Sequence, residues 1–389
     1  MHILHITPHL PPDQAANALL PFHLGMWAEA AGDEVGYVAH PPRQQQGRRA
    51  RAATSLPGRV AWVESHLESS GLARTLRLST GMTAIAIARA VAPAVAWADV
   101  VHIHSNGLIA EIGAVVANRQ RKPVVLTLYG TEIWHYKPKR GIDLFTRAYR
   151  RASHVVFYSH GLQTRATELG LGRRDTSVIY PPVAPEFTLH DERTQASARA
   201  ALGLKTRHLF VNVKRLHPLA GQQYLIEALG EVIRTHPDTR LVICGTGALL
   251  PELQATARAA GVEGHITFTG LLDNATIAQY DAAADAFVLP SLLEACPTVA
   301  LEALATGTPV ISSDNPGGVE LRELFGFDVS VVPRKQPLAL AHAMIQLLDD
   351  KRRVRATTSE IIEREFRPPA VQAQYKAIYE RAVRAAHGR

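Results

Sequence analysis

The sequence predicts an α/β protein made of two Rossmann-like domains. Its 389 residues are too many for one ordinary domain and suit two domains of roughly 150–200 residues each. Short apolar runs alternate with longer helical stretches along the whole chain, which is typical of parallel α/β architecture. Apolar residues make up 47% of the chain and charged residues 20%, as expected of a soluble globular protein.

Near-continuous apolar runs predict the strands, because parallel strands are buried on both faces. In the first half these strands are His2–Ile6, Glu34–Val38, Val100–His104, Val124–Leu128, His154–Tyr158 and Ser177–Ile179. In the second half they are Leu209–Val213, Arg240–Cys244, Ile266–Thr269, Ala286–Leu289, Pro309–Ser312 and Val329–Val332. The longer segments between strands, such as Leu20–Ala31 and Met82–Ala98, are predicted helices.

A polar, turn-rich passage from Pro181 to Lys205 predicts the domain boundary. Its prolines cannot extend a helix or a central strand. We therefore expect an N-terminal domain over residues 1–188 and a C-terminal domain over residues 189–367. The tail, residues 368–389, has a helical pattern and is expected to pack back on the first domain.

The positive charge is confined to the first half. Residues 1–190 hold 20 Lys and Arg against 13 Asp and Glu, whereas residues 191–389 hold 22 of each. A basic half indicates nucleic acid, an anionic membrane surface or an anionic substrate. No helix-turn-helix, RNP or zinc-finger pattern supports nucleic acid. The densest cluster, Arg43, Arg48, Arg49 and Arg51, is equally consistent with a solvated loop.

The cysteines and the apolar segments predict a cytoplasmic protein. Cys244 and Cys296 have no metal-ligand spacing and do not suggest a disulfide scaffold. The N-terminus lacks the features of a signal peptide. Arg89 and Pro93 interrupt the most apolar stretch, and a membrane-spanning helix needs about 20 apolar residues.

The segment from Ala284 to Ser313 predicts a ligand site. A buried strand ends in a turn, Glu294 follows in a loop, and Pro297 opens a helix that Gly307 ends. Such strand–loop–helix units bind ligands beyond the carboxyl ends of strands, and we expect the amides of residues 297–300 to point at an anion. Glu294 and Glu302 can face one cleft, where carboxylates accept hydrogen bonds from vicinal hydroxyls.

This run resembles the Glu-x7-Glu motif of the family 4 glycosyltransferases, which have the GT-B fold of two Rossmann-like domains facing a central cleft. The motif here is Glu294-Ala-Cys-Pro-Thr-Val-Ala-Leu-Glu302. The resemblance covers nearly the whole chain. Its further matches are Arg215-Leu216, Gly221, Leu225-Ile226, Gly245-Thr-Gly247, Gly270, Gly317-Gly318, Glu320, Asp99–His104 and Thr127–Glu132.

The resemblance implies roles for individual residues. Glu294 would contact the donor sugar, Glu302 the nucleotide ribose and Arg215 the diphosphate. The other residues implied at the donor site are Gly245, Gly247, Pro297, Thr298, Val299, Ala15, Ala16 and Lys214. In the first domain, Tyr129 and Glu132 occupy positions near the acceptor, and Glu132 is equally well explained as a cap of the next helix.

Three departures from the family pattern affect these expectations. The glycine pair of the first loop is Ala15-Ala16, whose methyl groups restrict positive φ and close approach to phosphate. The lysine expected before Gly221 is Ala220, which removes a charge-assisted phosphate contact unless Lys214 supplies it. The histidine of the family's His-Gly motif is replaced here by Tyr129, and a phenol cannot act as an imidazole near neutral pH.

The resemblance implies a retaining hexosyl transfer from a nucleotide sugar to a saccharide, glycolipid or other hydroxyl acceptor. The leaving phosphate does most of the acid–base work, so the protein stabilises charge on the diphosphate. No metal or other cofactor is expected. The sequence has no Asp-x-Asp motif, and Asp349-Asp350 are interpreted as surface residues. Gly245-x-Gly247 lacks the third glycine of a dinucleotide fingerprint.

The sequence predicts fewer residues of the acceptor site than of the donor site. His102 and His104 are more simply structural groups than catalysts, and Trp134 and His135 are candidates for lining the acceptor site. Many relatives dock one domain on anionic membranes, and the Arg43 cluster with the amphipathic stretch Gly71–Leu78 suggests peripheral attachment at the inner membrane face. Cell-surface polysaccharide or glycoconjugate synthesis is the expected setting.

Two other functions are compatible with the sequence. One is a different GT-B activity, such as an epimerase of nucleotide sugars or a phosphorylase, because fold does not fix function. The other is a nucleotide-sugar-binding protein with impaired catalysis, which the departures at Ala15-Ala16, Tyr129 and Ala220 motivate. Retention of Glu294, Glu302 and Arg215 favours the transferase over the binding protein.

Overall fold

The computed structural model describes residues 1–13, 15–41, 56–63, 78–138, 141 and 143–388. It forms two compact units, residues 1–179 with 372–389, and residues 180–371. The division follows Ile179, earlier than the boundary expected after residue 188. Residues 180–190 bond within the C-terminal unit: Val183 N donates to Phe366 O at 2.8 Å and His190 N to Thr306 O at 3.1 Å.

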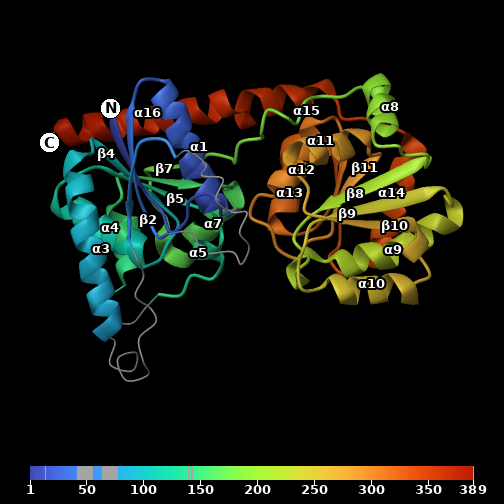
Figure 1. Cartoon of the computed structure of the whole chain (residues 1–389), viewed down its shortest axis with the longest axis horizontal. Helices are drawn as coiled ribbons and strands as arrows, with labels where there is room; N and C mark the ends of the chain where they lie inside the picture. Colours follow the sequence, from blue (N-terminus) through green and yellow to red (C-terminus); the bar gives the residue numbers. More distant parts are fainter. Residues whose placement is uncertain (14, 42–55, 64–77, 139–140, 142, 389) are drawn as a thin grey trace. The chain divides into compact units, whose positions relative to one another are not determined.

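The N-terminal unit contains a parallel sheet of seven described strands in the order β3-β2-β1-β4-β5-β6-β7 (Figure 1). The strands are β1 (His2–Ile6), β2 (Glu34–Ala39), β3 (Arg59–Trp62), β4 (Val100–His104), β5 (Val124–Leu128), β6 (His154–Phe157) and β7 (Thr176–Val178). The sequence prediction omitted β3. This edge strand has half-exposed and exposed side chains, so it lacks the apolar run that identifies a buried strand.

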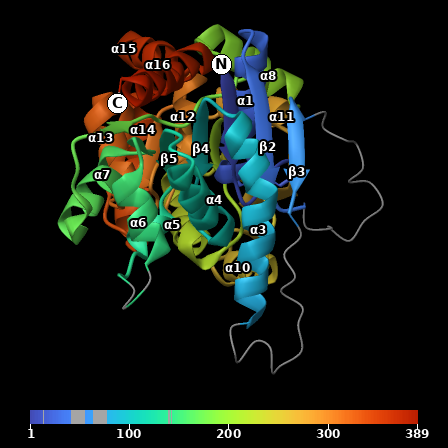
Figure 2. The same cartoon turned by 90° about the vertical axis from the view of Figure 1, so that its left-hand side faces the viewer.

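Helices cover both faces of this sheet. They are α1 (Ala16–Ala30), α3 (Leu78–Trp97), α4 (Leu108–Arg119), α5 (Thr131–Trp134), α6 (Leu144–Arg151), α7 (His160–Ala166) with the π-helical turn Thr167–Leu171, and α16 (Pro368–His387). Helices α3 and α4 pack side by side (Figures 1 and 2). The part of α16 from Gln372 onward belongs to this unit, and Gln372 Nε2 donates to Trp27 O in α1 at 2.9 Å.

The C-terminal unit has a parallel sheet of six described strands in the order β10-β9-β8-β11-β12-β13. The strands are β8 (His208–Val213), β9 (Thr239–Cys244), β10 (Ile266–Gly270), β11 (Ala286–Leu289), β12 (Val310–Ser313) and β13 (Val329–Val332). The helices are α8 (Glu192–Ala201), α9 (Gln222–Thr235), α10 (Leu250–Ala259), α11 (Asn274–Ala283), α12 (Thr298–Ala305), α13 (Pro316–Phe325), α14 (Pro337–Asp350) and α15 (Ala356–Ile361).

The expected linker, Pro181–Lys205, contains a helix that the prediction did not include. Helix α8 begins because the Asp191 side chain accepts a hydrogen bond from Thr194 N at 2.9 Å, and its alanines favour the helix. It packs on α11, which packs on α12, whereas α14 packs on α9 on the other face of the sheet (Figure 1). The prolines of the expected linker therefore lie only in its first part, before α8 begins.

Strand order places the functional loops of each unit. In both sheets the order reverses beside the first strand, between β1 and β4 and between β8 and β11. In open parallel sheets, ligands bind beyond the carboxyl ends of strands at this switch point. In the C-terminal unit the loops concerned are residues 214–221 after β8 and 290–297 after β11.

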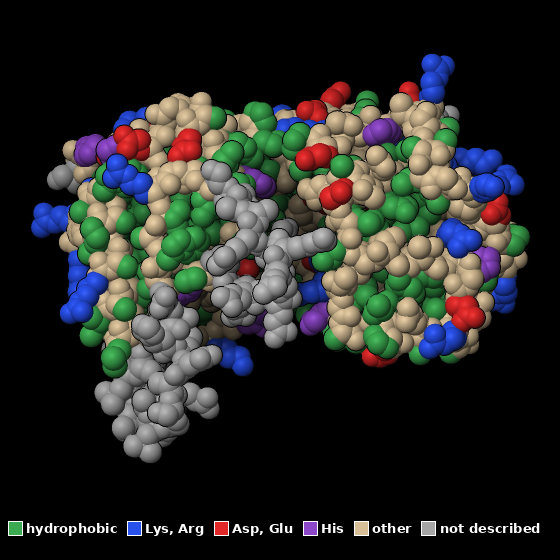
Figure 3. Space-filling model, viewed as in Figure 1, with side chains coloured by type: hydrophobic (Ala, Val, Ile, Leu, Met, Phe, Trp, Pro, Cys, Tyr) green, Lys and Arg blue, Asp and Glu red, His purple; other side chains and the backbone are tan. Residues whose placement is uncertain are grey.

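None of the described helices has both the length and the apolar character needed to cross a membrane. On the face drawn in Figure 3, apolar and uncharged atoms cover the middle of the C-terminal unit, and Lys and Arg side chains gather along one edge. The Arg43 cluster lies outside the described residues, as does the stretch Gly71–Leu78 apart from the backbone of Leu78.

Candidate active site

The loop after β11 carries the first motif glutamate. Gly317, in the first turn of α13, donates its backbone N–H to Glu294 O at 3.0 Å. A Cβ atom at Gly317 would lie 2.9 Å from Pro297 Cδ and 3.1 Å from Glu294 Cβ. Glycine is therefore needed for α13 to approach the motif loop this closely.

Buried polar side chains attach the start of the same loop to the end of β12. Asn315 is fully buried, and its Nδ2 donates to Ser291 O at 3.0 Å while its Oδ1 accepts from Gly318 N at 3.0 Å. The Ser313 hydroxyl also donates to Ser291 O. Asn315 thus caps α13 and anchors the motif loop with one side chain.

An ion pair joins the two loops at the switch point. Lys214, directly after β8, places its Nζ 2.6 Å from Glu294 Oε1. The Glu294 side chain is 11% exposed and that of Lys214 31% exposed, so the pair is partly shielded from water. Next along the chain, Arg215 is exposed, and its side chain makes no hydrogen bond or ion pair to the described residues. One cation is therefore paired and its neighbour is available to a ligand.

The loops after β8 and β9 approach each other closely at two glycines. Gly245 has φ +139°, and a Cβ there would lie 2.2 Å from Lys214 O. A Cβ at Gly247 would lie 2.1 Å from Leu216 O. Gly245 thus brings the β9 loop against the backbone of Lys214 and Arg215, and Gly247 brings it against Leu216, so both glycines support the site through packing of the loops.

The start of α12 differs from the prediction. Pro297 is the residue before the helix, with φ −80° and ψ 93°, and it has no amide hydrogen. Ala300 N donates to Pro297 O at 3.0 Å. The expectation that the amides of all four residues 297–300 face an anion is therefore wrong. Thr298 and Val299, the first two helical residues, have amides without an acceptor inside the helix.

The second motif glutamate lies on α12 in a low-dielectric environment. Burial, with the negative charge of Glu186 as the smaller cause, raises the pKa of Glu302 to about 7. Asp281 of α11 is fully buried, and neither of its carboxylate oxygens has a hydrogen-bond partner in the described chain. Burial and the charge of Glu302 raise the pKa of Asp281 well above its usual range. Glu302 is thus poised to change charge near neutral pH.

In the N-terminal unit, Glu132 uses its carboxylate within its own loop. Its Oε2 accepts from Tyr129 N at 3.2 Å and Gly130 N at 2.8 Å, and its Oε1 accepts from the Ser105 hydroxyl. This local capping is the alternative that the sequence left open. Ala15 and Ala16 are exposed at the start of α1, where Ala15 precedes the helix without a side-chain cap.

Tyr129 is connected to a buried histidine network. Its hydroxyl lies 2.7 Å from His104 Nδ1, and its ring meets Tyr158 edge-on at 4.6 Å. Burial raises the pKa of Tyr129 well above its usual value. Among the neighbouring candidates, Trp134 has a buried Nε1 without a partner in the described structure, and His135 is exposed. Tyr129 is therefore a neutral hydrogen-bonding group.

The network itself joins β1, β4, β5 and α16. His5 Nδ1 lies 3.0 Å from His104 Nε2. His102 lies between Tyr379 Oη and Thr127 Oγ1, both at 2.7 Å. Burial lowers the pKa of all three histidines, that of His5 to about 3. His102 and His104 are thus buried and hydrogen-bonded on both ring nitrogens, which is compatible with the structural role that the sequence favoured.

His5 is the member of the network that the sequence analysis missed. Its Nε2 is buried without a partner among the described residues. The only signal in the sequence was a histidine inside the apolar strand at residues 2–6, about 100 positions from the two histidines that were noticed. Ring nitrogens of the three histidines lie within 4.8 Å of one another, a spacing compatible with a metal. However, hydrogen bonds occupy both nitrogens of His102 and of His104.

Comparison with known families adds independent findings. Residues 194–364 match the family model described as Glycosyl transferases group 1, and residues 22–187 match the model described as Glycosyltransferase Family 4. The chain is 32% identical over 295 residues to a Bacillus subtilis protein named as a teichuronic acid biosynthesis glycosyltransferase, covering 75% of this chain and 68% of that protein.

A second relative is the GDP-mannose-dependent alpha-(1-6)-phosphatidylinositol monomannoside mannosyltransferase of Mycolicibacterium smegmatis. It is 30% identical over 256 residues, which cover 64% of this chain and 66% of that enzyme. The matched region is therefore just under two thirds of that relative.

Solved structures share the fold. HepE (Alr3699) from Anabaena, in complex with UDP, superposes with a TM-score of 0.75 at 21% identity, covering 97% of this chain and 99% of that chain. Sucrose-phosphate synthase from Thermosynechococcus elongatus gives a TM-score of 0.74 at 19% identity, with 99% of both chains covered. At such identities the likeness concerns the fold, which is GT-B.

Proposed function

The chain belongs to the family 4 glycosyltransferases, and we propose that it is a retaining enzyme that transfers a hexosyl group from a nucleoside diphosphate sugar to a hydroxyl acceptor. The observation that carries the donor assignment is the 2.6 Å pair of Lys214 and Glu294 at the switch point of the C-terminal sheet. This pair supports the proposal because a carboxylate that can accept from sugar hydroxyls lies beside a cation that suits a phosphate.

The donor fits the chemistry of this edge of the sheet. Glu294 accepts hydrogen bonds from the sugar hydroxyls, and Glu302 accepts from the ribose. Arg215 and the amides of Thr298 and Val299 face the diphosphate and stabilise the charge that grows when the C1–O bond breaks. Preorganised donors of this kind contribute about 3–4 kcal/mol each to the transition state. The leaving phosphate then accepts the proton of the attacking hydroxyl, on the same face of the sugar.

Lys214 makes the phosphate contact of the family's lysine, whose position in this chain is occupied by Ala220. Lys214 extends from the end of β8, and its ammonium group already lies at the motif loop. With donor bound, the ammonium can hold both Glu294 and a phosphate oxygen, because it has three donor hydrogens. Tyr129, backed by His104, supplies a neutral hydrogen-bond donor where an imidazole is expected.

We propose further that turnover needs no metal ion or other cofactor. Arg215, Lys214 and the start of α12 provide the positive electrostatic environment that a metal would otherwise supply to a leaving diphosphate. Activity that persists undiminished in excess EDTA supports this, and activity restored only by a divalent cation contradicts it.

The acceptor is proposed to be a saccharide or a lipid-linked sugar in cell-surface polysaccharide or glycoconjugate synthesis. The relatives named for teichuronic acid synthesis and for a phosphatidylinositol mannoside support this class.

We also propose a cytoplasmic enzyme that attaches peripherally to the inner membrane face through the basic N-terminal half. Sedimentation with anionic vesicles tests the attachment: salt-sensitive binding is expected, and no binding at low salt would remove it.

The first experiment is a thermal-shift panel of UDP, GDP, ADP and CMP with their sugar nucleotides, on wild type and Glu302→Ala. One nucleotide should stabilise the wild type and not the variant. With that donor, NMR of the product anomer then tests retention. Release of an altered nucleotide sugar without acceptor would instead indicate an epimerase. Binding without release of nucleoside diphosphate with any acceptor would indicate a non-catalytic binding protein.

A further inference from the structure

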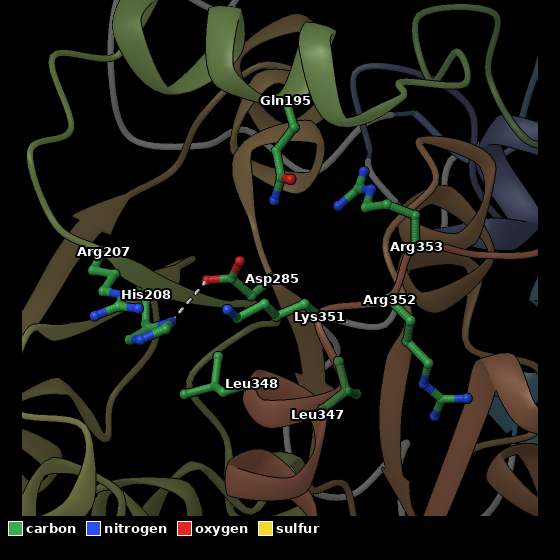
Figure 4. A pocket seen from close by; sticks show the side chains of 9 residues that line it. All are labelled: Gln195, Arg207, His208, Asp285, Leu347, Leu348, Lys351, Arg352 and Arg353. Carbon is green, nitrogen blue, oxygen red and sulfur yellow. Dashed lines mark ion pairs between the residues drawn. The ribbon is translucent and has the colours of Figure 1, made fainter.

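The C-terminal unit contains a cavity of about 340 Å³ beside Asp285, at the starts of β8 and β11 (Figure 4). The acid in this cavity is already bonded, because Asp285 Oδ2 accepts from Arg199 Nη2 at 2.8 Å. Two of the cations that line it, Arg207 and Lys351, are exposed to water. Arg352 is directed away from both of them (Figure 4). The cavity therefore holds no cluster of unpaired cations, and the buried histidines of the N-terminal unit carry more information.

A continuous series of hydrogen bonds runs through this histidine network and ends at Tyr129. His5 Nδ1 lies 3.0 Å from His104 Nε2, and His104 Nδ1 lies 2.7 Å from the Tyr129 hydroxyl. Both rings are neutral near pH 7, because burial lowers the pKa of His5 to about 3 and that of His104 well below its ordinary value. In a neutral imidazole one nitrogen donates and the other accepts. The two hydrogen bonds therefore have to run in the same direction.

The unpaired end of the series favours one of the two directions. His5 is fully buried, and its Nε2 has no partner among the described residues. If the series ran from Tyr129 to His5, this Nε2 would carry a hydrogen that no acceptor receives. A buried N–H without an acceptor is rare and costly, and the opposite direction leaves only a lone pair there. His5 and His104 are therefore assigned as the tautomers with hydrogen on Nδ1.

This direction leaves the hydrogen of the Tyr129 hydroxyl available to a ligand. The Tyr129 oxygen accepts from His104 Nδ1, so its own hydrogen is not used in the series. Tyr129 is half-buried, and its hydroxyl has no second partner in the described part of the chain. It directly follows β5 at the carboxyl edge of the sheet, where ligands of open parallel sheets bind. The opposite direction would direct the hydrogen of Tyr129 to His104.

We propose that His5 is a positioning residue, which acts through His104 to make the Tyr129 hydroxyl a hydrogen-bond donor to a substrate oxygen. The proposal rests on the proposed transferase function, because the substrate is that of the transfer reaction. Without the donor at His5, His104 can adopt the other tautomer and accept the hydrogen of Tyr129. The substrate oxygen then loses its hydrogen bond, although Tyr129 and His104 are both still present.

The direction of the series is tested by NMR on the full chain, labelled with ¹⁵N at its histidines, at about pH 7.5. Long-range proton–nitrogen spectra distinguish a ring nitrogen that carries hydrogen from one that does not. The signals missing from His5→Asn and from His104→Asn identify these two among the 18 histidines. We expect hydrogen on Nδ1 and none on Nε2 in both rings. Hydrogen on Nε2 of either ring would overturn the proposal, and this readout needs no turnover.

The coupling of His5 to Tyr129 is tested by a double-mutant cycle on kcat/KM. His5→Leu and Tyr129→Phe should each lower kcat/KM about 3- to 10-fold, as expected for the loss of one hydrogen bond. When Tyr129→Phe is already present, adding His5→Leu should have little further effect, because the hydroxyl through which His5 acts is absent. His5→Asn should keep most of the activity, since its amide N–H can donate to His104 from near the position of Nδ1.

His154→Leu is the matched control. His154 is a buried histidine of the same sheet that bonds to Ser177 and is not part of the series. This variant should lower the free energy of unfolding and leave kcat/KM unchanged. Equal losses from His5→Leu with and without the Tyr129 hydroxyl would overturn the role of His5 and leave the transferase standing. A wild type that transfers no sugar would contradict the proposed transferase, and the role of Tyr129 with it.

Discussion

Glu302 predicts a pH-dependent donor affinity. Its pKa of about 7 arises from burial and from the charge of Glu186. Only the carboxylate form can accept from two ribose hydroxyls, so affinity should be full above pH 7 and fall as the pH drops below it, by up to about tenfold per pH unit. A nucleotide sugar is the suitable probe, because its diphosphate is a diester that does not titrate near neutrality.

Calorimetry with the donor between about pH 6 and 8 measures this effect. Glu302→Gln should bind more weakly than wild type at high pH and show a flat profile, because it cannot ionise. A slope in Glu302→Gln equal to that of the wild type would assign the pH dependence to another group.

A second prediction at the residue scale concerns the position of the phosphate-binding lysine. Lys214→Ala should lower kcat/KM by about 10- to 100-fold, because a hydrogen bond to a charged group is lost. In Lys214→Ala/Ala220→Lys, the cation returns to the position that the family resemblance indicates, and part of the activity lost in Lys214→Ala should return. Ala220 is 3% exposed, so Ala220→Lys alone is the control for steric tolerance. An unchanged kcat/KM in Lys214→Ala would exclude the role.

At the scale of elements, Asn315 predicts that the motif loop and α13 are coupled. Asn315→Ala removes the helix cap and a buried bond to Ser291 O, and we expect a loss of about 2–3 kcal/mol in the free energy of unfolding. Asn315→Asp keeps the acceptor for Gly318 N and loses the donor, so it separates the two contributions. Urea unfolding measures stability, and donor titration should show weaker binding for both. An alanine variant as stable as wild type contradicts the coupling.

The sequence predicted most elements of the fold because the central strands are continuous apolar runs between turns. It missed β3, whose side chains are only partly buried, and α8, which follows the linker prolines and begins at the cap Asp191. It placed Pro297 inside α12, since proline suits the first turn of a helix. In the structure Pro297 has ψ 93°, which is not helical. Patterns of residue type locate elements well, and they do not determine which terminal residue is helical.

At the scale of the whole molecule, the sequence predicted two Rossmann-like domains but not what assembles from distant segments. The ion pair of Lys214 and Glu294 was not predicted, because it depends on which strands are neighbours. The same holds for the histidine network, which joins His5 to residues about 100 positions away, and for the cavity beside Asp285. Strand order is a property of the sheet, and only the sheet brings these residues together.

The buried histidines predict that acid destabilises the N-terminal unit. His5, His102 and His104 have folded-state pKa values below the ordinary value, because burial disfavours the imidazolium. Below about pH 6.5 the unfolded chain binds protons that the folded unit does not. Stability should therefore be full above that pH and fall as the pH drops towards about 3, by up to about 1.4 kcal/mol per pH unit for each histidine.

Tryptophan fluorescence can follow this unit alone, because Trp27, Trp62, Trp97 and Trp134, the four tryptophans of the chain, all lie in residues 1–179. Urea unfolding at about pH 7.5, 6.5 and 5.5 gives the slope. His5→Gln should be less stable at pH 7.5, because its bond to His104 is lost, and should show a slope smaller by up to one proton. His135→Gln, at an exposed site, should match the wild type. A wild-type slope in His5→Gln would mean that His5 does not stay neutral in the folded unit, and the acid sensitivity would then belong to other groups.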